Sequence, residues 1–395
     1  MFNLRSFNIT FVLYCLLIPG IWLFTTSAKA QDFKTVRDGI EYSVVRREFS
    51  GKPVNINLLK LDLTKVRIDV HHAMDAAIGT EKTSSIAIRQ GAVAAINAGF
   101  FRLDTSIFAG DAAGALTIDG RRLSESTNDR VVLFITNKPE RSDTYIAPLQ
   151  TYDMVQIKKW DLLLSGINRE RKADELVMFT PDFHRTTLTN GSGLELVIVG
   201  DKISEIRDLA GSTPIPTNGY VLSATGSFRN RLLPLVKKGS KVFRLSSLSR
   251  DNKGHFMTEE NARISDAFHV AEDIVAGVPQ LIKNGKIDIT WEQEKSSKAF
   301  VETRHPRTAV AKLKDGKFLM LTADGRREAS GGLDLYDLAA YLLELGATDA
   351  MNLDGGGSTT MFLDGKVVNQ PSDREGERKV SDAILVTLRP PKKNK

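Results

Sequence analysis

A run of three glycines that directly follows an aspartate, at Asp354–Gly357, is the stretch that most constrains how this chain can fold. Glycine has no Cβ, so it adopts backbone conformations closed to other residues and lets main-chain N–H groups approach a ligand. Strand-like segments lie on both sides, at 349–353 and 359–363. The pattern predicts a buried strand that opens into a glycine loop, with a carboxylate at the strand exit and the hydroxyls of Ser358 and Thr359 beyond it.

Two other interpretations of this loop compete with a ligand site. The phosphate loop of nucleotide-binding proteins requires G-x-x-x-x-G-K-[ST] followed by a helix. No lysine follows these glycines and the next residues predict a strand, which argues against nucleotide binding of that kind. A tight turn between two strands remains open, but an aspartate, three glycines, a serine and a threonine are more than such a turn needs.

The first thirty residues predict an export signal. Arg5 supplies positive charge, residues 11–24 form an apolar run, and Ala28-Lys29-Ala30 fits a cleavage site. The run is short for a membrane span, which needs about 20 apolar residues, so an uncleaved anchor is the alternative. The only cysteine, Cys15, lies in this segment. The mature chain, exported to the periplasm or the extracellular space, is then expected to contain no disulfide and no thiol nucleophile.

The charge balance disfavours nucleic acid as a partner. The chain has 54 basic and 48 acidic residues; removing a leader with Arg5 and Lys29 leaves 52 against 48, a net charge of +4. Arg389 and the basic tail 391–395 carry that excess, and the body shows no interleaving of basic and aromatic residues. The tail is predicted to be solvated or to touch an anionic envelope surface, and no membrane span is expected after processing.

Alternating apolar and polar residues predict an α+β fold, a mixed and largely antiparallel β-sheet core with flanking helices. Residues 31–90 form a β-rich N-terminal segment packed on that core. Residues 155–165 predict a strand within a middle section, about 137–218, that has no catalytic spacing and is either an embellishment or a small subdomain. His71 and His72 are interpreted as strand-end residues and not as a metal site.

Polar side chains recur where predicted strands begin or end. Strand 92–96 delivers Asn97, followed by two phenylalanines, which suits either a sugar-contacting corner or core aromatics beside a turn. Pro306 forces an extended entry, so Arg307 and Thr308 begin a strand. An arginine there suits recognition of a phosphate or carboxylate, or a structural contact with a carboxylate.

A predicted strand–helix–strand unit carries further candidates. Strand 317–322 leads to Asp324 and Arg326, and a helix with leucines at helical spacing covers 334–345. If the strands on either side of this helix are parallel, their exits share one sheet edge. That arrangement would bring Asp324, Arg326, Asn352 and Asp354 together, whereas an acid in the first helical turn, such as Asp337, complements the helix dipole.

The motif set as a whole resembles the phosphodiester glycosidase family, whose bacterial members are often labelled exopolysaccharide-related. The matching segments are Asn97–Phe101, Gly277–Pro279, Pro306–Val310, Asp324–Arg326, the helix 335–346 and Asn352–Met361. The resemblance covers about 92–388 and implies a phosphodiester glycosidase domain over 91–390. Family members often carry Glu where this helix has Asp337, and the middle section has no matching motif.

The resemblance implies hydrolysis of a sugar C1–O–phosphate linkage in an envelope or extracellular glycan. A phosphate monoester leaves easily, because its second pKa is roughly 6 against about 15.7 for water. The reaction then needs a carboxylate that activates water or attacks C1, and donors on the phosphate. The expected roles are Asp354 as nucleophile or base; Asp324 as second carboxylate; Arg307, Arg326 and the Gly355, Gly356 and Gly357 amides on the phosphate; Asn97, Asn352 and Thr308 on the sugar; and Ser358 and Thr359 lining the site.

Two alternatives belong to other functional classes. One is a metal-dependent phosphodiesterase that breaks the P–O bond, with Asp324, Asn352 and Asp354 as oxygen ligands for Ca²⁺ or Mg²⁺; no cofactor is otherwise implied. The other is a non-catalytic module that binds envelope polysaccharide. Its groove would depend more on exposed aromatics, and the mature chain has only two tryptophans, Trp160 and Trp291.

Overall fold

The computed structural model describes residues 31–248 and 258–390. The predicted export signal with Cys15 and the basic tail 391–395 lie outside the described residues. The chain from Phe33 onward forms one compact unit, which is the part described below. Within the described ranges, no helix has the length and apolar character needed to cross a membrane.

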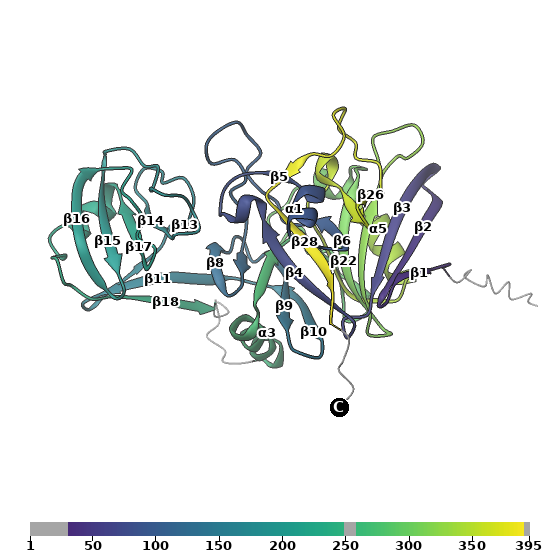
Figure 1. The fold of residues 1–395 in the computed structure, drawn as a ribbon, viewed down its shortest axis with the longest axis horizontal. Coiled ribbons are helices and arrows are strands. Elements are labelled where there is room, and N and C mark those ends of the chain that lie inside the picture. Colours follow the sequence, from purple (N-terminus) through teal and green to yellow (C-terminus); the bar gives the residue numbers. More distant parts are fainter. Residues whose placement is uncertain (1–30, 249–257, 391–395) are drawn as a thin grey trace, which may run out of the picture. The chain divides into compact units, whose positions relative to one another are not determined.

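An eight-stranded sheet carries the glycine motif (Figure 1). Every neighbouring pair in it is antiparallel. In sheet order, its strands are β1 (Lys34–Arg37), β2 (Ile40–Phe49), β3 (Lys52–Leu61), β23 (Phe318–Ala323), β22 (Arg307–Leu313), β24 (Ala347–Asn352), β20 (Gln280–Lys283) and β21 (Lys286–Ile287). Because β23 and β24 both pair antiparallel with β22, they run parallel to each other with β22 between them.

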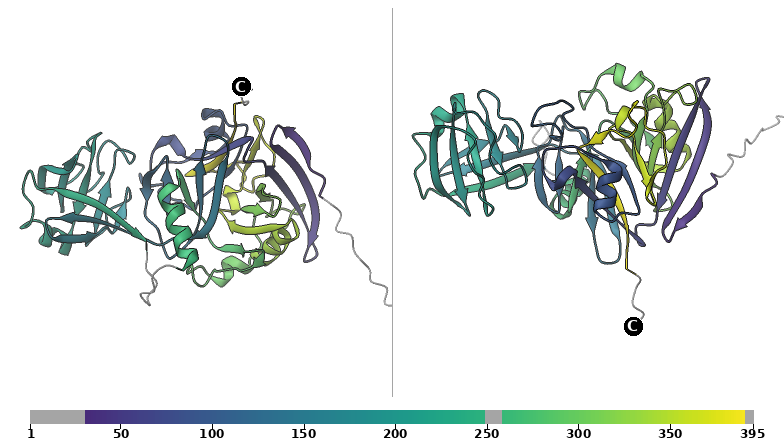
Figure 2. Two further views of the ribbon diagram at one scale, coloured as in Figure 1. Left: turned by 90° about the horizontal axis from the view of Figure 1, so that it is seen from below. Right: turned by 45° about the horizontal axis from the view of Figure 1, so that its top comes forward.

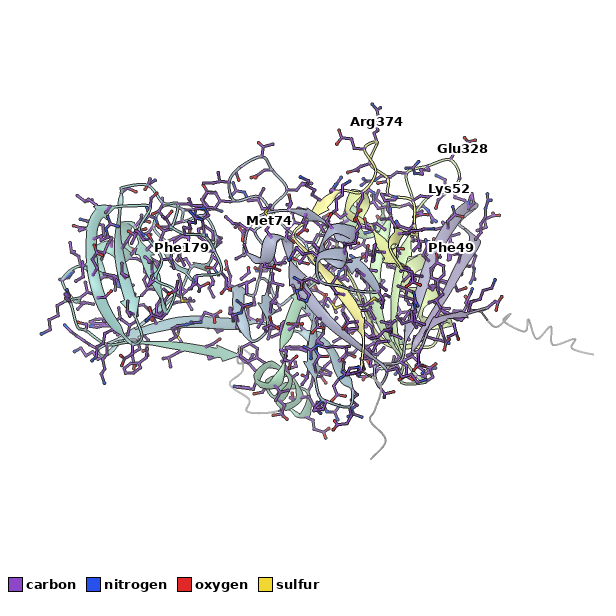
Figure 3. All side chains as sticks on the ribbon, in the orientation of Figure 1. Phe49, Lys52, Met74, Phe179, Glu328 and Arg374 are labelled. Atoms are coloured by element: carbon purple, nitrogen blue, oxygen red, sulfur yellow. The ribbon has the colours of Figure 1, made fainter. Side chains whose placement is uncertain are left out.

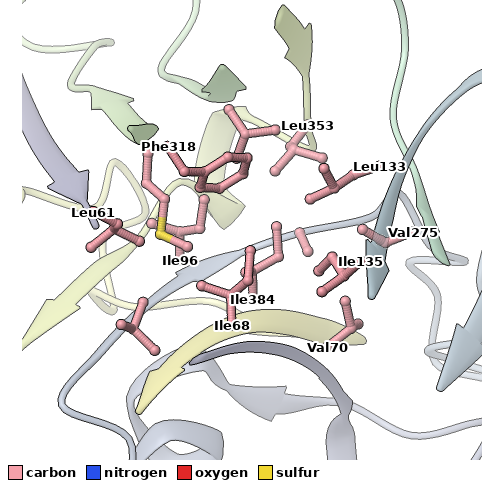
Figure 4. Packing of buried hydrophobic residues seen from close by; sticks show 14 of the residues in the cluster. Leu61, Ile68, Val70, Ile96, Leu133, Ile135, Val275, Phe318, Leu353 and Ile384 are labelled. Atoms are coloured by element: carbon pink, nitrogen blue, oxygen red, sulfur yellow. The ribbon is translucent and has the colours of Figure 1, made fainter. Parts of the chain in front are cut away.

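Two five-stranded sheets pack against one face of this sheet. The first contains β26 (Lys366–Val367), β25 (Met361–Leu363), β6 (Ala94–Asn97), β28 (Asp382–Leu388) and β4 (Val66–His72). The second contains β10 (Ser142–Pro148), β9 (Val131–Asn137), β19 (Asp273–Ala276), β7 (Leu116–Ile118) and β8 (Arg121–Ser124). Their inward side chains meet those of the main sheet in one buried cluster, in which Phe318 and Leu353 pack with Ile96, Ile384 and Leu133 (Figure 4).

Helices cover the other face of the main sheet. α5 (Leu335–Glu344) buries Leu335, Leu338 and Leu342 against Leu58 and Leu321 of the sheet. Asp334 caps it by accepting a hydrogen bond from the Asp337 amide (2.8 Å), and Asp337 pairs with Arg304. The predicted helix is therefore confirmed. The remaining helices are η1 (Ala73–Asp75), α1 (Thr83–Arg89), α2 (Gly226–Leu232), α3 (Glu259–Val270), α4 (Lys298–Glu302) and η2 (Gly356–Ser358).

Residues 151–248 form strands with a buried cluster of their own, and Figure 2 shows them as a separate group of strands. One sheet contains β12 (Trp160–Leu163), β11 (Thr151–Ile157) and β18 (Val242–Leu248). The other contains β13 (Gly166–Ile167), β14 (Leu176–Phe179), β17 (Gly219–Ala224), β15 (Gly193–Val199) and β16 (Lys202–Ala210). The single strand predicted over 155–165 is wrong, because this stretch is the β11–β12 hairpin with Lys158 at positive φ in its turn.

The largely antiparallel α+β fold is confirmed. Among the strand pairs of the described residues, only β13 and β14 run parallel. A last two-stranded sheet pairs β5 (Glu81–Lys82) with β27 (Lys379–Val380). The segment 31–90, predicted to be β-rich, contains β1 to β5. β23 and β24 have the shared direction that the strand–helix–strand pattern required.

Candidate active site

The backbone of Asp354 is held at the exit of β24 by the turn that follows β6. The Asp354 amide donates to the Ala98 carbonyl (2.9 Å), and the Asn97 side-chain amide donates to the Asp354 carbonyl (2.7 Å). The Asp354 Oδ1 atom accepts the Gly355 amide at 2.9 Å. The residue as a whole is half-buried, and the contact with the Gly355 amide fixes the position of its carboxylate.

Asn97 and Thr308 stabilise this loop through hydrogen bonds in the protein interior. Both side chains are fully buried. The Thr308 hydroxyl donates to Asn97 Oδ1 (2.8 Å), which also accepts the Thr360 amide (3.1 Å). The sequence assigns both residues to sugar contact, whereas their contacts within the protein hold the two ends of the glycine loop together.

Asn352 joins the loop to the segment before β20. Its side-chain amide donates to the carbonyls of Val278 (2.7 Å) and Leu353 (2.9 Å). Its Oδ1 atom is buried and has no hydrogen-bond partner in the described part of the chain, and the same is true of the hydroxyls of Thr359 and Thr360. The Ser358 hydroxyl is also buried and lies close enough to the Asp354 carboxyl to lower its pKa. Buried polar atoms are normally paired, so the unpartnered oxygens mark the loop as a place where polar partners are missing.

A backbone contact requires glycine at Gly355 and a positive φ favours it at Gly356, whereas Gly357 faces two side chains. A Cβ on Gly355 would lie 2.7 Å from the Pro306 carbonyl oxygen, and a Cβ on Gly356, whose φ is +61°, would lie 2.9 Å from Arg326 Nη2. Gly357 lies against the side chains of Arg378 and Asp373. The Gly355 amide donates to Asp354 and the Gly356 amide to the Pro306 carbonyl (2.8 Å). Two of the three amides assigned to phosphate therefore bind within the protein.

Arg307 and Arg326 have opposite environments. Arg307 is 1% exposed and donates to the carbonyls of Leu333 (3.0 Å), Phe300 (2.8 Å) and Thr303 (2.7 Å). Burial lowers its pKa to about 10, which leaves it charged at neutral pH. These contacts favour the structural alternative for Arg307.

Arg326 is exposed and lies over the glycine loop. Its Nη2 atom donates to His305 Nδ1 at 3.3 Å, the one hydrogen bond that the described residues offer its side chain. Burial, followed by the charges of Arg307 and Arg326, lowers the pKa of His305. A guanidinium without a carboxylate partner, beside a neutral imidazole, is available for an anionic ligand.

Arg378 is a second guanidinium at the loop that sequence reasoning missed. It forms a two-point ion pair with Asp373 (2.8 and 3.0 Å) and packs against Gly357. The loop that bears it is joined to the loop after β23, because Arg327 donates to the Pro371 carbonyl (2.6 Å). Figure 3 shows Glu328 and Arg374, from these two loops, at the same end of the molecule.

Asp324 is connected to the glycine loop through Asn369. Asp324 is 2% exposed, and its Oδ1 atom accepts the Gln370 amide (3.0 Å) and the Asn369 side-chain amide (3.3 Å). Asn369 also donates to the Thr359 carbonyl (3.0 Å). Burial raises the pKa of Asp324. In the described part of the chain no hydrogen bond joins Asp324 to Asp354, whose strands are separated by β22.

Asp382 is a buried carboxylate whose negative charge raises the pKa of Asp354, and sequence reasoning missed it. It begins β28, is 1% exposed, and accepts the Gly99 amide (2.5 Å) and the Ser381 hydroxyl (2.6 Å). Burial raises its pKa, and the neighbouring His72 opposes that rise. An aspartate directly before the apolar run 383–386 was the available signal, because the other candidate acids also lie at strand ends.

The Asp354 carboxyl has its pKa raised to about 7. Burial is the main cause and the charge of Asp382 adds to it; the Ser358 hydroxyl, the Gly355 amide and Arg378 oppose it. A carboxyl group with this pKa is a stronger base than an ordinary aspartate and exchanges a proton near neutral pH. Asp324, Asn352 and Asp354 were also considered as metal ligands; among the described residues, no three His, Cys, Asp or Glu side chains are placed to hold a metal ion.

Comparison with known proteins identifies the region around this loop. Residues 192–387 match the family model of Phosphodiester glycosidase. Over 169 residues the chain is 31% identical to mouse (Mus musculus) N-acetylglucosamine-1-phosphodiester alpha-N-acetylglucosaminidase, covering 40% of this chain and 30% of the mouse protein. The chain thus spans less than a third of the length of that relative.

Two solved structures share the fold. A hypothetical protein from Synechocystis has a TM-score of 0.76 and 21% identity, covering 92% of this chain and 64% of the other. A protein from Burkholderia pseudomallei K96243 whose name suggests export has a TM-score of 0.71 and 24% identity, covering 86% and 74%. The region matched by the family model, residues 192–387, contains Asp324, Arg326, Asp354, Arg378 and Asp382. Residues 192–387, just under half of the chain, match the phosphodiester glycosidase family.

Proposed function

We propose that this chain hydrolyses a sugar-1-phosphodiester at the C1–O bond, with Asp354 as the base or nucleophile. The observation that carries this proposal is the Asp354 carboxyl, with its pKa raised to about 7 by burial, on a loop contacted by Arg326 and Arg378. The family match supports the reaction class. The departing phosphate monoester needs little protonation, so the protein's main tasks are to activate water or attack C1 and to bind the phosphate.

The proposed roles divide the site into reacting and supporting residues. Arg326 and Arg378 bind the phosphate, as guanidinium groups do with two parallel hydrogen bonds. Asp324 supports the loop through Asn369 and Gln370, and Asn97, Thr308 and Arg307 hold the backbone beneath it. The Asn352 oxygen and the hydroxyls of Ser358 and Thr359, which the sequence assigns to substrate contact, are buried in the loop.

A panel of chromogenic sugar-1-phosphodiesters, assayed with and without a chelator, tests the reaction. Hydrolysis in ¹⁸O-labelled water is expected to place the label on the sugar, because the C1–O bond breaks. Label on the phosphate would show P–O cleavage and favour the metal-dependent phosphodiesterase. A chain that turns over no member of the panel but binds the glycan would be the polysaccharide-binding module.

The substrate is proposed to be an envelope or extracellular glycan. The predicted leader supports export to the periplasm or the extracellular space. The mouse relative's name specifies an N-acetylglucosamine phosphodiester, which makes that sugar the first to include in the panel. Residues 91–390 are proposed as the glycosidase domain and 31–90 as its N-terminal β-rich part.

The pH profile of kcat/KM is expected to have an ascending limb with its midpoint near pH 7. As a base or nucleophile, Asp354 must be ionised, and with a pKa of about 7 it loses its proton as pH rises through that value. Below it, kcat/KM is expected to fall about tenfold per pH unit. The measurement is kcat/KM across pH on one chromogenic substrate. A rate that falls as pH rises through 7 would instead make Asp354 a general acid.

Changing the charges around Asp354 is expected to move this limb in opposite directions. Asp382→Asn removes a negative charge that raises the Asp354 pKa, so the limb moves to lower pH. Arg378→Gln removes a positive charge that lowers it, so the limb moves to higher pH. Asparagine can still accept the Gly99 amide, which keeps the turn in place. If both variants move the limb in the same direction, the assignment of the limb to Asp354 is wrong.

A further inference from the structure

A cavity lies beside β20, one of the two strands that pair with β24. Its volume is about 410 Å³, and Asn261 and Ile264 of α3, Asp129, Gln150, Gln280 and Gln293 are among the residues that line it. Small-molecule sites typically measure about 300–1,000 Å³. Asp354 and the glycine loop do not line this cavity, so it is distinct from the candidate active site.

The walls of the cavity are fixed by buried hydrogen bonds. Glu294 is 2% exposed, and its carboxylate accepts the amides of Val131 (3.0 Å) and Gln280 (2.8 Å) and the Thr290 hydroxyl (2.5 Å). These contacts tie together two walls that are far apart in the sequence. The cavity is therefore formed without a ligand, which lowers the entropy cost of binding one.

The α3 wall is anchored in the same way. Glu260, in the first turn of the helix, pairs with Lys283 (2.8 Å) and accepts the Tyr145 hydroxyl (2.7 Å). Ile264 and Phe268, on the same side of the helix, pack into the cluster around Phe134. Asn261 and Ile264 are three positions apart, so both face the cavity from one rigid face.

Some polar side chains of the lining have no hydrogen-bond partner among the described residues. The side chains of Asn261, Gln293 and Asp129 make no hydrogen bond with the described residues, whereas Gln150 Oε1 accepts the Asp129 amide (3.1 Å). Among the described residues, those that line the cavity include no lysine or arginine. Side-chain amides and a carboxylate, beside apolar walls that include Ile264, match the hydroxyls and C–H groups of a neutral sugar.

We infer that this cavity is a binding site for a neutral sugar. The inference that this sugar belongs to the substrate rests on the proposed function. Gln280 is paired with Met351, three residues before Asp354. At about 3.3 Å per strand residue, the cavity wall lies on the order of 10 Å from the glycine loop. A short oligosaccharide can span that distance, so the cavity would hold part of the glycan while its sugar phosphate reacts at Asp354.

Binding is tested with four phosphate-free probes, cellobiose, maltose, N,N′-diacetylchitobiose and myo-inositol, by calorimetry on the full chain. At least one is expected to bind saturably. The Asn261→Ala/Gln293→Ala variant is expected to weaken that binding by roughly tenfold or more, as two lost hydrogen bonds imply. The control, Arg263→Ala/Glu292→Ala, changes neighbours on the same two segments that do not line the cavity and is expected to bind normally.

Two further results separate this inference from the proposed reaction. Asp354→Asn is expected to bind the probe unchanged, so a failed hydrolysis assay leaves the cavity result intact. Ile264→Trp fills the cavity and is expected to raise KM for an oligosaccharide phosphodiester without changing kcat/KM for a monosaccharide one. If no probe binds, or if the cavity variant binds as tightly as the control, the inference is wrong.

Discussion

Replacing Asp354 by asparagine is expected to lower kcat/KM for a sugar-1-phosphodiester by about 10²–10⁴-fold, the usual contribution of a positioned base. Asparagine has the same size and its Oδ1 atom can still accept the Gly355 amide, which Asp354 accepts at 2.9 Å. The backbone contacts to Ala98 and Asn97 do not involve the carboxylate. The variant loses the ability to take a proton or attack C1, and its unfolding midpoint in urea is expected to stay close to that of the parent.

Asp324→Asn provides the matched comparison. The Asp324 Oδ1 atom accepts two hydrogen bonds that an asparagine oxygen can keep, so a supporting role predicts a much smaller loss of activity. An equal loss in both variants would restore Asp324 as the second catalytic carboxylate that the sequence predicts. Full activity in Asp354→Asn would remove Asp354 from the mechanism.

The parts of the fold that depend on local pattern could be predicted from the sequence. The spacing of Leu335, Leu338 and Leu342 specifies the buried face of α5, and Asp334 is its N-cap. The parallel directions of β23 and β24 follow from the helix that connects them. The position of Asp354 between a buried strand and a glycine loop is local in the same sense, because glycine permits the turn that the strand exit requires.

The local sequence could not predict the residues that reach the glycine loop through pairing between strands far apart in the chain. Asp382 reaches the turn at Gly99 because β28 inserts between β6 and β4. Asn369 reaches Asp324 because the chain folds back after β26. Nothing in the local sequence of either residue specifies these partners, since strand order depends on which apolar faces pack together.

The hairpin of β11 and β12 shows a second reason why part of the fold could not be predicted from the sequence. Its two turn residues, Lys158 and Lys159, lie between the paired residues Ile157 and Trp160. Lys158 adopts positive φ, a conformation that Asn or Gly usually supplies in such a turn. Two lysines inside an apolar and polar alternation give no turn signal, so the stretch looks like one strand in the sequence.

The sequence predicts that Arg307 and Arg326 both bind the phosphate. Replacement by methionine is nevertheless expected to lower stability at Arg307 and activity at Arg326. Arg307→Met leaves the part-buried carbonyls of Phe300 and Thr303 without donors, at about 1–3 kcal/mol each, while the Leu333 carbonyl keeps the His305 amide. The variant is therefore expected to lower the free energy of unfolding by about 2 kcal/mol or more. Arg326→Met removes an exposed side chain, where changes usually stay within about 0.5 kcal/mol. It is expected to lower kcat/KM roughly tenfold to hundredfold by removing a donor to the phosphate. Urea unfolding and kcat/KM, measured on both variants, decide the assignment. A stable but inactive Arg307→Met variant would instead place that guanidinium on the phosphate.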